Sequence, residues 1–225
     1  MFEAKMKTAS VFKKIVDALK DIVKEGTIYC NPNGIEIITL DTAHVMMCNV
    51  TLHSIGFDTY TCNEPAVIGI SFVILSQILR CANDNDELYL KLNDKQDDSI
   101  FITFKSSAGT SEFELKLMTI DEERFEIPDM EYEHSIELKS KEFVRLISDI
   151  NQFSDTCTLT IGEDKFEIAA NGEGGNAKME YTDCKIAIKE GTASLSSSYQ
   201  IKYLMISTKA SKLADTVILQ LAKPH

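Results

Sequence analysis

Basic side chains gather on one arc of the first amphipathic segment of this chain. Residues 11–26 read VFKKIVDALKDIVKEG, a spacing that predicts a helix. At about 100° per residue, its apolar side chains fall on one arc and its polar ones on the opposite arc. The polar arc carries Lys13, Lys14, Lys20, Lys24, Asp17 and Asp21. This net positive face could bind an anionic partner by salt-dependent attraction, or could be an ordinary solvated face.

Three later segments also have helical spacing and basic residues on their polar sides. They cover residues 71–84, 140–153 and 199–214. Their basic residues include Arg80 in the first, Lys141 and Arg145 in the second, and Lys202 and Lys209 in the third. The formal net charge of the chain is −12, which argues against wrapping of nucleic acid around the whole surface. It leaves room for a local basic face.

Short runs of alternating apolar and polar residues surround these helices and predict strands. They cover residues 34–40, 44–52, 56–62, 87–93, 99–105, 111–118, 157–162, 165–170, 177–181, 184–189 and 216–221. The order helix, strands, helix, strands therefore occurs twice, and the first helix recurs after about 130 residues. That interval fits a duplicated domain, so we predict an α+β fold with two similar domains, residues 1–118 and 134–225.

An acidic segment, residues 119–133, lies between the two halves and has no steady period. Pro128 disfavours helix at Ile127, so we expect an extended, exposed connecting loop. Phe125 and Ile127 are apolar residues within it. They could pin the loop to the domains or form part of a docking surface.

Composition and motifs exclude several classes of protein. The N-terminus has no apolar signal region and no stretch approaches about 18 apolar residues, so we expect a chain that is neither secreted nor membrane-spanning. The six cysteines form no C-x-x-C pair, which favours reduced thiols over a metal site. The glycine-rich run 171–178 lacks the ending of a phosphate-binding loop and is expected to be a hairpin turn. We therefore expect no enzyme activity, no metal and no cofactor.

The order of several short sequences resembles a known family. MFEA at the start, ALKDIV, LDTAHV, GFDTY, ILRCA, ELKLM, IPDMEY and TKA follow one another as in the eukaryotic DNA sliding clamps, the proliferating cell nuclear antigen family. The resemblance covers essentially the whole chain. It implies two similar clamp domains per subunit, with two helices on antiparallel sheets in each, and a ring-shaped trimer located in the nucleus that acts as a DNA polymerase processivity factor in replication and repair.

In clamps of this family the helices line a central hole through which double-stranded DNA passes without sequence preference. The resemblance places these residues on the positive lining: Lys13, Lys14, Lys20, Arg80, Arg145, Lys202 and Lys209. Lysine and arginine hold phosphates without fixing the duplex in one register.

The family also docks partners and joins subunits through surfaces that can be transferred to this chain. A hydrophobic groove receives the PIP box of polymerases, ligases and flap nucleases, and a clamp loader places the ring on DNA. The groove residues implied here are Leu40, His44, Val45, Met47, Phe125, Ile127, Pro128 and Tyr132. The strand with Phe113 would pair with the strand of a neighbouring subunit that contains Lys178, Met179 and Tyr181.

The end of the sequence departs from the family pattern. TVILQLAKPH stops where relatives continue through a further hairpin and a short acidic tail. We therefore expect the second domain to lack its last hairpin and one wall of the partner groove. Two other functions stay open: a subunit of a checkpoint-type heterotrimeric clamp, and an enzyme with an unrecognised active site.

Overall fold

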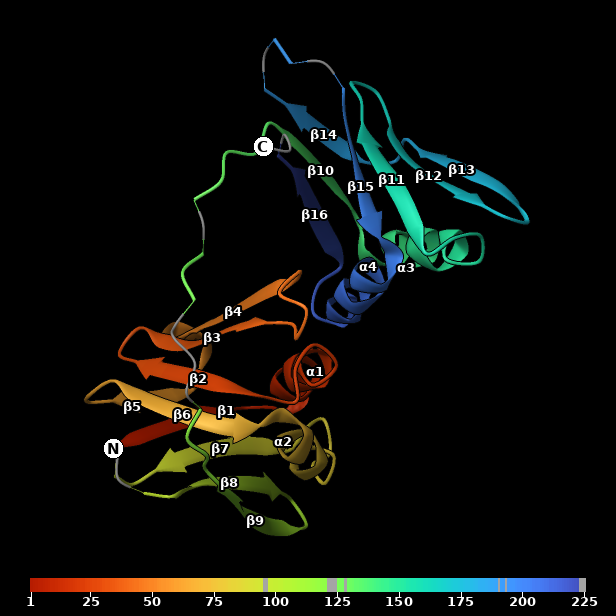
Figure 1. The fold of residues 1–225 in the computed structure, drawn as a ribbon. Helices are drawn as coiled ribbons and strands as arrows, with labels where there is room; N and C mark the ends of the chain where they lie inside the picture. The colour runs from red at the N-terminus through yellow and green to blue at the C-terminus, as the bar shows by residue number, and fades with distance from the viewer. Residues whose placement is uncertain (95–96, 121–124, 128, 190, 193, 223–225) are drawn as a thin grey trace. The chain divides into compact units, whose positions relative to one another are not determined.

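The computed structural model describes residues 1–94, 97–120, 125–127, 129–189, 191–192 and 194–222 (Figure 1). The chain divides into two compact units, Met1–Glu126 and Ile127–His225. Among the described residues, each unit contains two α-helices packed on antiparallel sheets, which is the α+β architecture of two similar domains expected from the sequence.

The first unit begins with a strand and a helix and continues mostly in strands. Its elements are β1 (Phe2–Met6), α1 (Ser10–Leu19), β2 (Glu25–Asn31), β3 (Gly34–Leu40), β4 (Met47–His53), the 3-10 helix η1 (Ser54–Gly56), β5 (Thr59–Cys62), β6 (Ala66–Ser71), α2 (Phe72–Leu79), β7 (Glu87–Leu92), β8 (Ser99–Ser106) and β9 (Gly109–Lys116). They form a four-stranded sheet in the order β4-β3-β2-β6 and a five-stranded sheet in the order β5-β1-β7-β8-β9.

The second unit repeats this plan. Its elements are β10 (His134–Lys139), α3 (Ser140–Ile150), β11 (Thr156–Ile161), β12 (Phe166–Gly172), β13 (Gly175–Tyr181), β14 (Lys185–Ile188), β15 (Leu195–Gln200), α4 (Ile201–Ser207), the 3-10 helix η2 (Thr208–Lys212) and β16 (Thr216–Leu221). The sheets have the orders β13-β12-β11-β15 and β14-β10-β16. In the described residues, the second sheet has three strands where its counterpart in the first unit has five.

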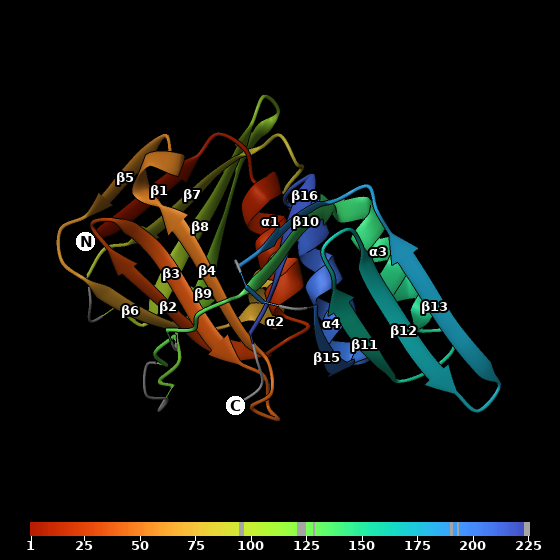
Figure 2. The ribbon, with the colours of Figure 1, turned by 90° about the horizontal axis from the view of Figure 1, so that it is seen from above.

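In each unit the two helices lie side by side, as both ribbon views show (Figures 1 and 2). The buried side of α1 consists of Phe12, Ile15, Val16 and Leu19. The buried apolar residues of α3 are Phe143, Leu146, Ile147 and Ile150. Because these faces are buried in the core of their own unit, the polar faces that carry the basic residues point outward.

The first helix is shorter than the sequence pattern predicts. It ends at Leu19, where the N–H groups of Ile22 and Val23 both reach the Leu19 carbonyl. The next residues, from Glu25, pair with both β3 and β6 as β2. The helical spacing of the sequence continues past Leu19. Pairing of β2 on both sides, which buries Ile28 and Cys30, nevertheless stabilises an extended strand there instead of more helix.

The prediction of one helix over residues 199–214 is wrong. Tyr199 and Gln200 belong to β15, which pairs along its whole length with β11. The helix α4 then runs for seven residues and passes into η2, so Lys202 and Lys209 lie on different helical elements.

Five strands are present that the alternation pattern did not predict. They are β1, β2, β6, β10 and β15. β6 is buried at five of its six positions, and its run AVIGIS shows no clear alternation between apolar and polar residues. The alternation test detects strands with one wet face, so it passes over β6. This reason does not apply to β1 and β10, whose burial alternates along the strand.

Candidate nucleic-acid interface

The seven basic residues implied by the resemblance all lie on or at the end of a helix. In the first unit, Lys13 and Lys14 are in α1, while Lys20 and Arg80 follow the last residues of α1 and α2. In the second unit, Arg145 is in α3, Lys202 in α4 and Lys209 in η2. Within the described residues, the fold thus places a basic residue on or directly after each of the four α-helices.

A polar contact joins the two helices of the first unit. The Asp17 carboxylate accepts hydrogen bonds on Oδ1 from Lys20 Nζ (2.7 Å) and from the Ser76 hydroxyl of α2 (2.8 Å). Burial by itself would raise the pKa of Asp17, but these two hydrogen bonds and the charges of Lys20 and Arg80 lower it. The charge of Lys20 is therefore partly neutralised within its own unit.

Lys13 also has partners within the first unit. Its Nζ donates to the Ala82 carbonyl (3.0 Å) and to Asp84 Oδ1 (3.4 Å), both in the turn that follows α2. Lys14, one residue further along α1, is half-buried.

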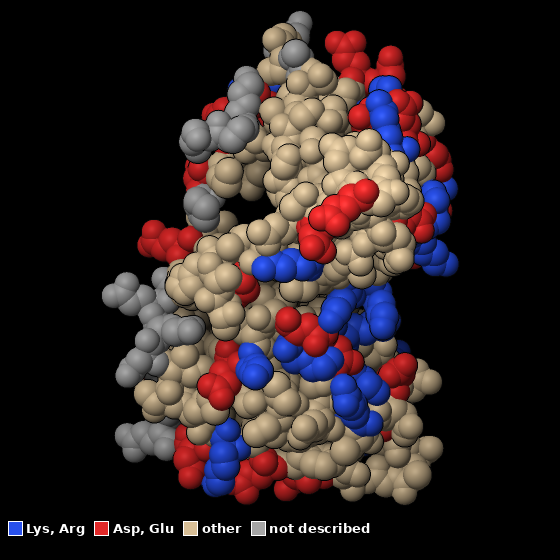
Figure 3. All heavy atoms as spheres, turned by 45° about the vertical axis from the view of Figure 1, so that its right-hand side comes forward, with Lys and Arg blue, Asp and Glu red and all other residues tan. Residues whose placement is uncertain are grey.

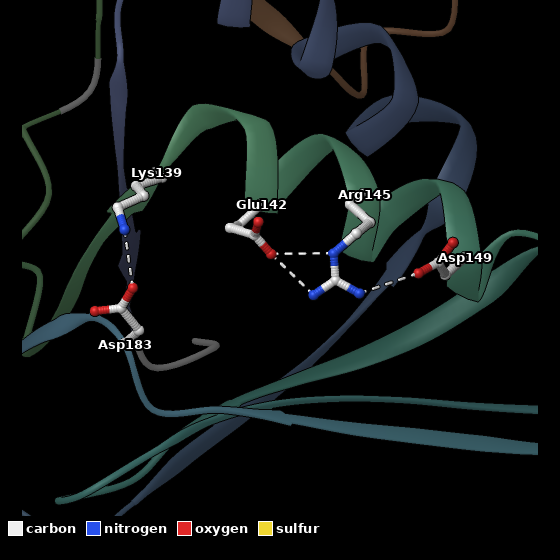
Figure 4. A network of polar contacts seen from close by, with 5 residues as sticks. All are labelled: Lys139, Glu142, Arg145, Asp149 and Asp183. Atoms are coloured by element: carbon white, nitrogen blue, oxygen red, sulfur yellow. Dashed lines mark hydrogen bonds and ion pairs between the residues drawn. The ribbon is translucent and has the colours of Figure 1, made fainter.

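Arg145 lies between two carboxylates of its own helix (Figure 4). Its Nε and one terminal nitrogen donate to the same oxygen of Glu142, at 3.0 and 2.8 Å, and its other terminal nitrogen donates to Asp149 at 3.5 Å. Hydrogen bonding of Arg145 to the Glu142 carboxylate, which accepts, is the main cause of the raised pKa of Arg145. The i, i+3 and i, i+4 spacing makes both pairs possible on one helix face.

The surface therefore carries mixed charges instead of an unbroken basic patch. Figure 3 shows blue and red side chains next to one another on the face in view. Lys202 and Lys209 are both exposed, and the ammonium group of Lys202 lies 4.7 Å from the ring centre of Tyr203. Such a surface can attract phosphates while its own acids compete for the same cations.

Part of the predicted partner groove coincides with a hollow of about 810 Å³ in the first unit. The segment from Lys20 to Glu25, the residues Leu40, Asp41 and Thr42, and the side chains of His44 and Phe125 line it. Three of the eight predicted groove residues, Leu40, His44 and Phe125, are thus brought together.

Four of the other predicted groove residues are not among those that line this hollow. Val45, which is 63% exposed, and Met47 belong to the same unit as the hollow but do not line it. Ile127 and Tyr132 are exposed residues of the second unit. Pro128 lies outside the described residues.

A buried carboxylate shapes the loop beside the hollow. Asp41 Oδ1 accepts hydrogen bonds from the amides of Val45 and Met46, each at 2.7 Å, and Oδ2 accepts one from Ala43 at 3.2 Å. His44 has a φ of 55°, in the left-handed region that side chains usually avoid. Hydrogen bonds from three amides stabilise this turn and hold Val45 at the surface.

The strands predicted to join subunits lie at the ends of their sheets. Phe113 is in β9, the last strand of the five-stranded sheet, and its ring packs 5.6 Å from that of Phe104. Lys178, Met179 and Tyr181 are in β13, the last strand of a four-stranded sheet. Each of these strands has one sheet neighbour among the described residues, which leaves its other edge open there.

The described residues also bear on metal-binding, membrane-spanning and thiol chemistry. There, no group of three or more His, Cys, Asp or Glu side chains could hold a metal ion, and no helix is long and apolar enough to cross a membrane. Burial is the main cause that raises the pKa of Cys30 to about 12 and that of Cys157 to about 11, which is the opposite of an activated thiolate.

Sequence reasoning missed the acidic partners of the basic residues. Glu142 and Asp149 could have been found from their i, i+3 and i, i+4 spacing to Arg145, and Asp17 from its spacing to Lys20. Ser76 lies 59 residues from Asp17, and no local pattern could have paired them. Asp41, in the motif LDTAHV, could have been suspected as a turn former.

Comparison with known proteins matches both units. A family described as the N-terminal domain of proliferating cell nuclear antigen matches residues 1–125, and one described as its C-terminal domain matches residues 126–225. Proliferating cell nuclear antigen 2 of Drosophila melanogaster is 33% identical over 229 residues, which cover 99% of this chain and 88% of the relative. Proliferating cell nuclear antigen of Dictyostelium discoideum is 31% identical over 233 residues, covering 99% and 90%.

The Asp41 turn yields a testable prediction. Asp41→Ala removes the acceptor of three amides, and we expect it to destabilise the first unit by about 1–3 kcal/mol. Hydrogen exchange at the amides of Val45 and Met46 should become faster, because their hydrogen-bond partner is lost. Asp41→Asn keeps one acceptor oxygen and should have a smaller effect. Unchanged exchange in Asp41→Ala would contradict the role assigned to the carboxylate.

Proposed function

Since the chain belongs to the proliferating cell nuclear antigen family, we propose that it is a noncatalytic sliding clamp that encircles double-stranded DNA and tethers replication and repair proteins to it. The observation that carries the proposal is the match of both domain families, in order, across residues 1–225. DNA polymerase, a clamp loader and PIP-box proteins such as ligase and flap nuclease are the proposed partners, and the nucleus is the proposed location.

The placement of the basic residues supports binding to DNA. Each unit contributes cations from both of its helices, while the chain as a whole has a formal net charge of −12. Helix cations can contact phosphates without reading bases, and an acidic remainder repels DNA from other surfaces. This combination suits a protein that must hold a duplex at any sequence.

The hollow beside the Asp41 turn supports partner docking. Its lining combines apolar side chains, among them Leu40 and Phe125, with polar and charged ones such as His44 and Lys24. A short helical turn with apolar anchors commonly binds such a surface. Val45 is held exposed beside it and would widen the apolar contact.

The two open edge strands support a homotrimer. If β9 of one subunit pairs with β13 of the next, one sheet continues across each boundary and three such contacts close a ring. The checkpoint-type heterotrimeric clamp remains the alternative, because the same fold and edges would serve it. Self-association separates the two possibilities.

The DNA proposal predicts the effect of reversing two exposed charges. In the double variant Lys202→Glu and Lys209→Glu, affinity for a fluorescent duplex should fall about tenfold or more, and the salt dependence should weaken. Fluorescence anisotropy over a series of salt concentrations measures both quantities. Lys185→Glu with Lys189→Glu is the matched control, since these exposed lysines have the same charge and lie on or beside β14. Equal losses in both double variants would reject the assignment.

The trimer proposal predicts a mass in solution. Light scattering on a size-exclusion column should give about three times the 25.2 kDa of one chain at micromolar concentration, since β9 and β13 both offer open edges. A mass that stays at one chain at every concentration contradicts the homotrimer. A trimeric mass that forms only on mixing with a second clamp-like chain supports the checkpoint-type alternative.

The docking proposal predicts the effect of a charge beside the hollow. Val45→Glu should weaken binding of a synthetic PIP-box peptide about tenfold or more, because it buries a carboxylate against apolar anchors. Isothermal titration calorimetry measures the affinity. Ile55→Glu, at a 92% exposed position in η1, is the control and should bind the peptide as the unchanged chain does. Normal binding by Val45→Glu would remove this residue from the groove.

A further inference from the structure

Three of the seven cations proposed to face DNA already have a carboxylate partner within their own unit. Lys13 pairs with Asp84, Lys20 with Asp17, and Arg145 with both Glu142 and Asp149. None of these acids belongs to the set that the sequence implied for any site. All four acids thus contact a cation that is proposed to bind phosphate.

We propose that these carboxylates are affinity-setting residues, which compete with DNA phosphates for the cations and so keep the hold of the clamp on DNA weak. The inference rests on the function proposed above. An exposed ion pair between side chains is weak enough for a phosphate to displace the acid, yet the displacement cancels part of the gain. When the duplex binds, each of these cations then exchanges a carboxylate partner for a phosphate.

Arg145 shows the competition most clearly. All three of its guanidinium nitrogens donate to carboxylates, and these bonds use three of its five N–H groups (Figure 4). A phosphate that pairs with Arg145 must therefore displace Glu142 or Asp149 or share the cation with them. The Arg145 side chain is 56% exposed and the Asp149 side chain is 46% exposed. The pair is therefore open to solvent, and DNA could reach it.

Lys20 is held in a more structural way. Its ammonium group contacts both the carboxylate and the main-chain carbonyl of Asp17, while the side chain is 20% exposed. Asp17 also accepts the hydrogen bond from Ser76, which is 2% exposed. Removing Asp17 would free the cation but would also loosen the contact between α1 and α2. Asp149 and Glu142 therefore give the cleaner test.

Ion pairs within the protein also change how many counterions DNA binding releases. A free lysine or arginine frees counterions from DNA when it neutralises a phosphate, and this release drives affinity and its salt dependence. A cation that already has a carboxylate brings an extra negative charge toward the duplex, so the net gain is smaller. Weak, replaceable contacts of this kind favour movement along DNA over arrest at one register.

The experiment compares duplex binding by the full chain and its variants at about 50 to 200 mM salt. Asp149→Asn and Glu142→Gln should each bind a fluorescent duplex about two- to fivefold more tightly at the lowest salt, with a steeper dependence on salt. Asp183→Asn is the matched control. It also removes one negative charge from the second unit, but its partner is Lys139, which is outside the proposed contact set (Figure 4).

A double-mutant cycle isolates the competition from general charge effects. In an Arg145→Gln background, Asp149→Asn should no longer tighten binding beyond the effect of Asp183→Asn, because the cation that it competes for is absent. Equal tightening by Asp149→Asn and by Asp183→Asn, or tightening that persists without Arg145, overturns the proposal.

The result also separates this inference from the proposed function. If Arg145→Gln weakens binding while the two acid variants leave it unchanged, the cation contacts DNA and the competition is refuted. If neither the unchanged chain nor any variant binds the duplex at any salt concentration, both the function and the inference are refuted. Far-ultraviolet circular dichroism of each variant verifies that α3 remains folded.

Discussion

An amphipathic helix of seven to eleven residues is stable in water only when its apolar face is buried, and this constraint underlies the rest of the structure. In the first unit, Phe12, Val16 and Leu19 fix the rotation of α1 about its axis because they must point into the core. In the second unit, Phe143, Leu146 and Ile150 do the same for α3. Because the rotation of each helix is fixed, its polar face must point away from the core, and the cations on that face point outward.

The charged side chains lie on the polar faces of the helices, whose direction is set by burial of the apolar faces. With 35 acidic and 23 basic residues, a cation on this surface will often lie near a carboxylate. The Asp17–Lys20 pair at the end of α1 and the pairs of Arg145 on α3 are local consequences of i, i+3 and i, i+4 spacing, and they are individually weak. For a protein that must hold DNA and still move along it, weak contacts are a suitable property.

Backbone edges complete the account. In β9 and β13 the hydrogen-bonding groups on one side have no strand neighbour within the described part of their unit, while half-buried apolar residues such as Phe113 and Met179 pack inward. An open edge of this kind can pair with a strand of another subunit. The proposed assembly would therefore use the same backbone hydrogen bonds between strands that hold each sheet together. The proposed docking of partners would use a different feature, a hollow beside a turn that the buried carboxylate of Asp41 organises.

The sequence by itself determined the duplicated plan, the apolar faces of the helices, most of the alternating strands and the family. It also placed every proposed cation on or beside a helical segment, because a period of 3.6 residues is visible in the order of the residues. Only the tertiary structure decided that α1 ends at Leu19, since pairing of β2 with β3 and β6 depends on strands distant in the sequence. It alone brought Ser76 to Asp17 and Asp84 to Lys13, across 59 and 71 residues. Local periodicity describes neighbours three or four residues apart, whereas such contacts arise only when two helices pack together on a common core.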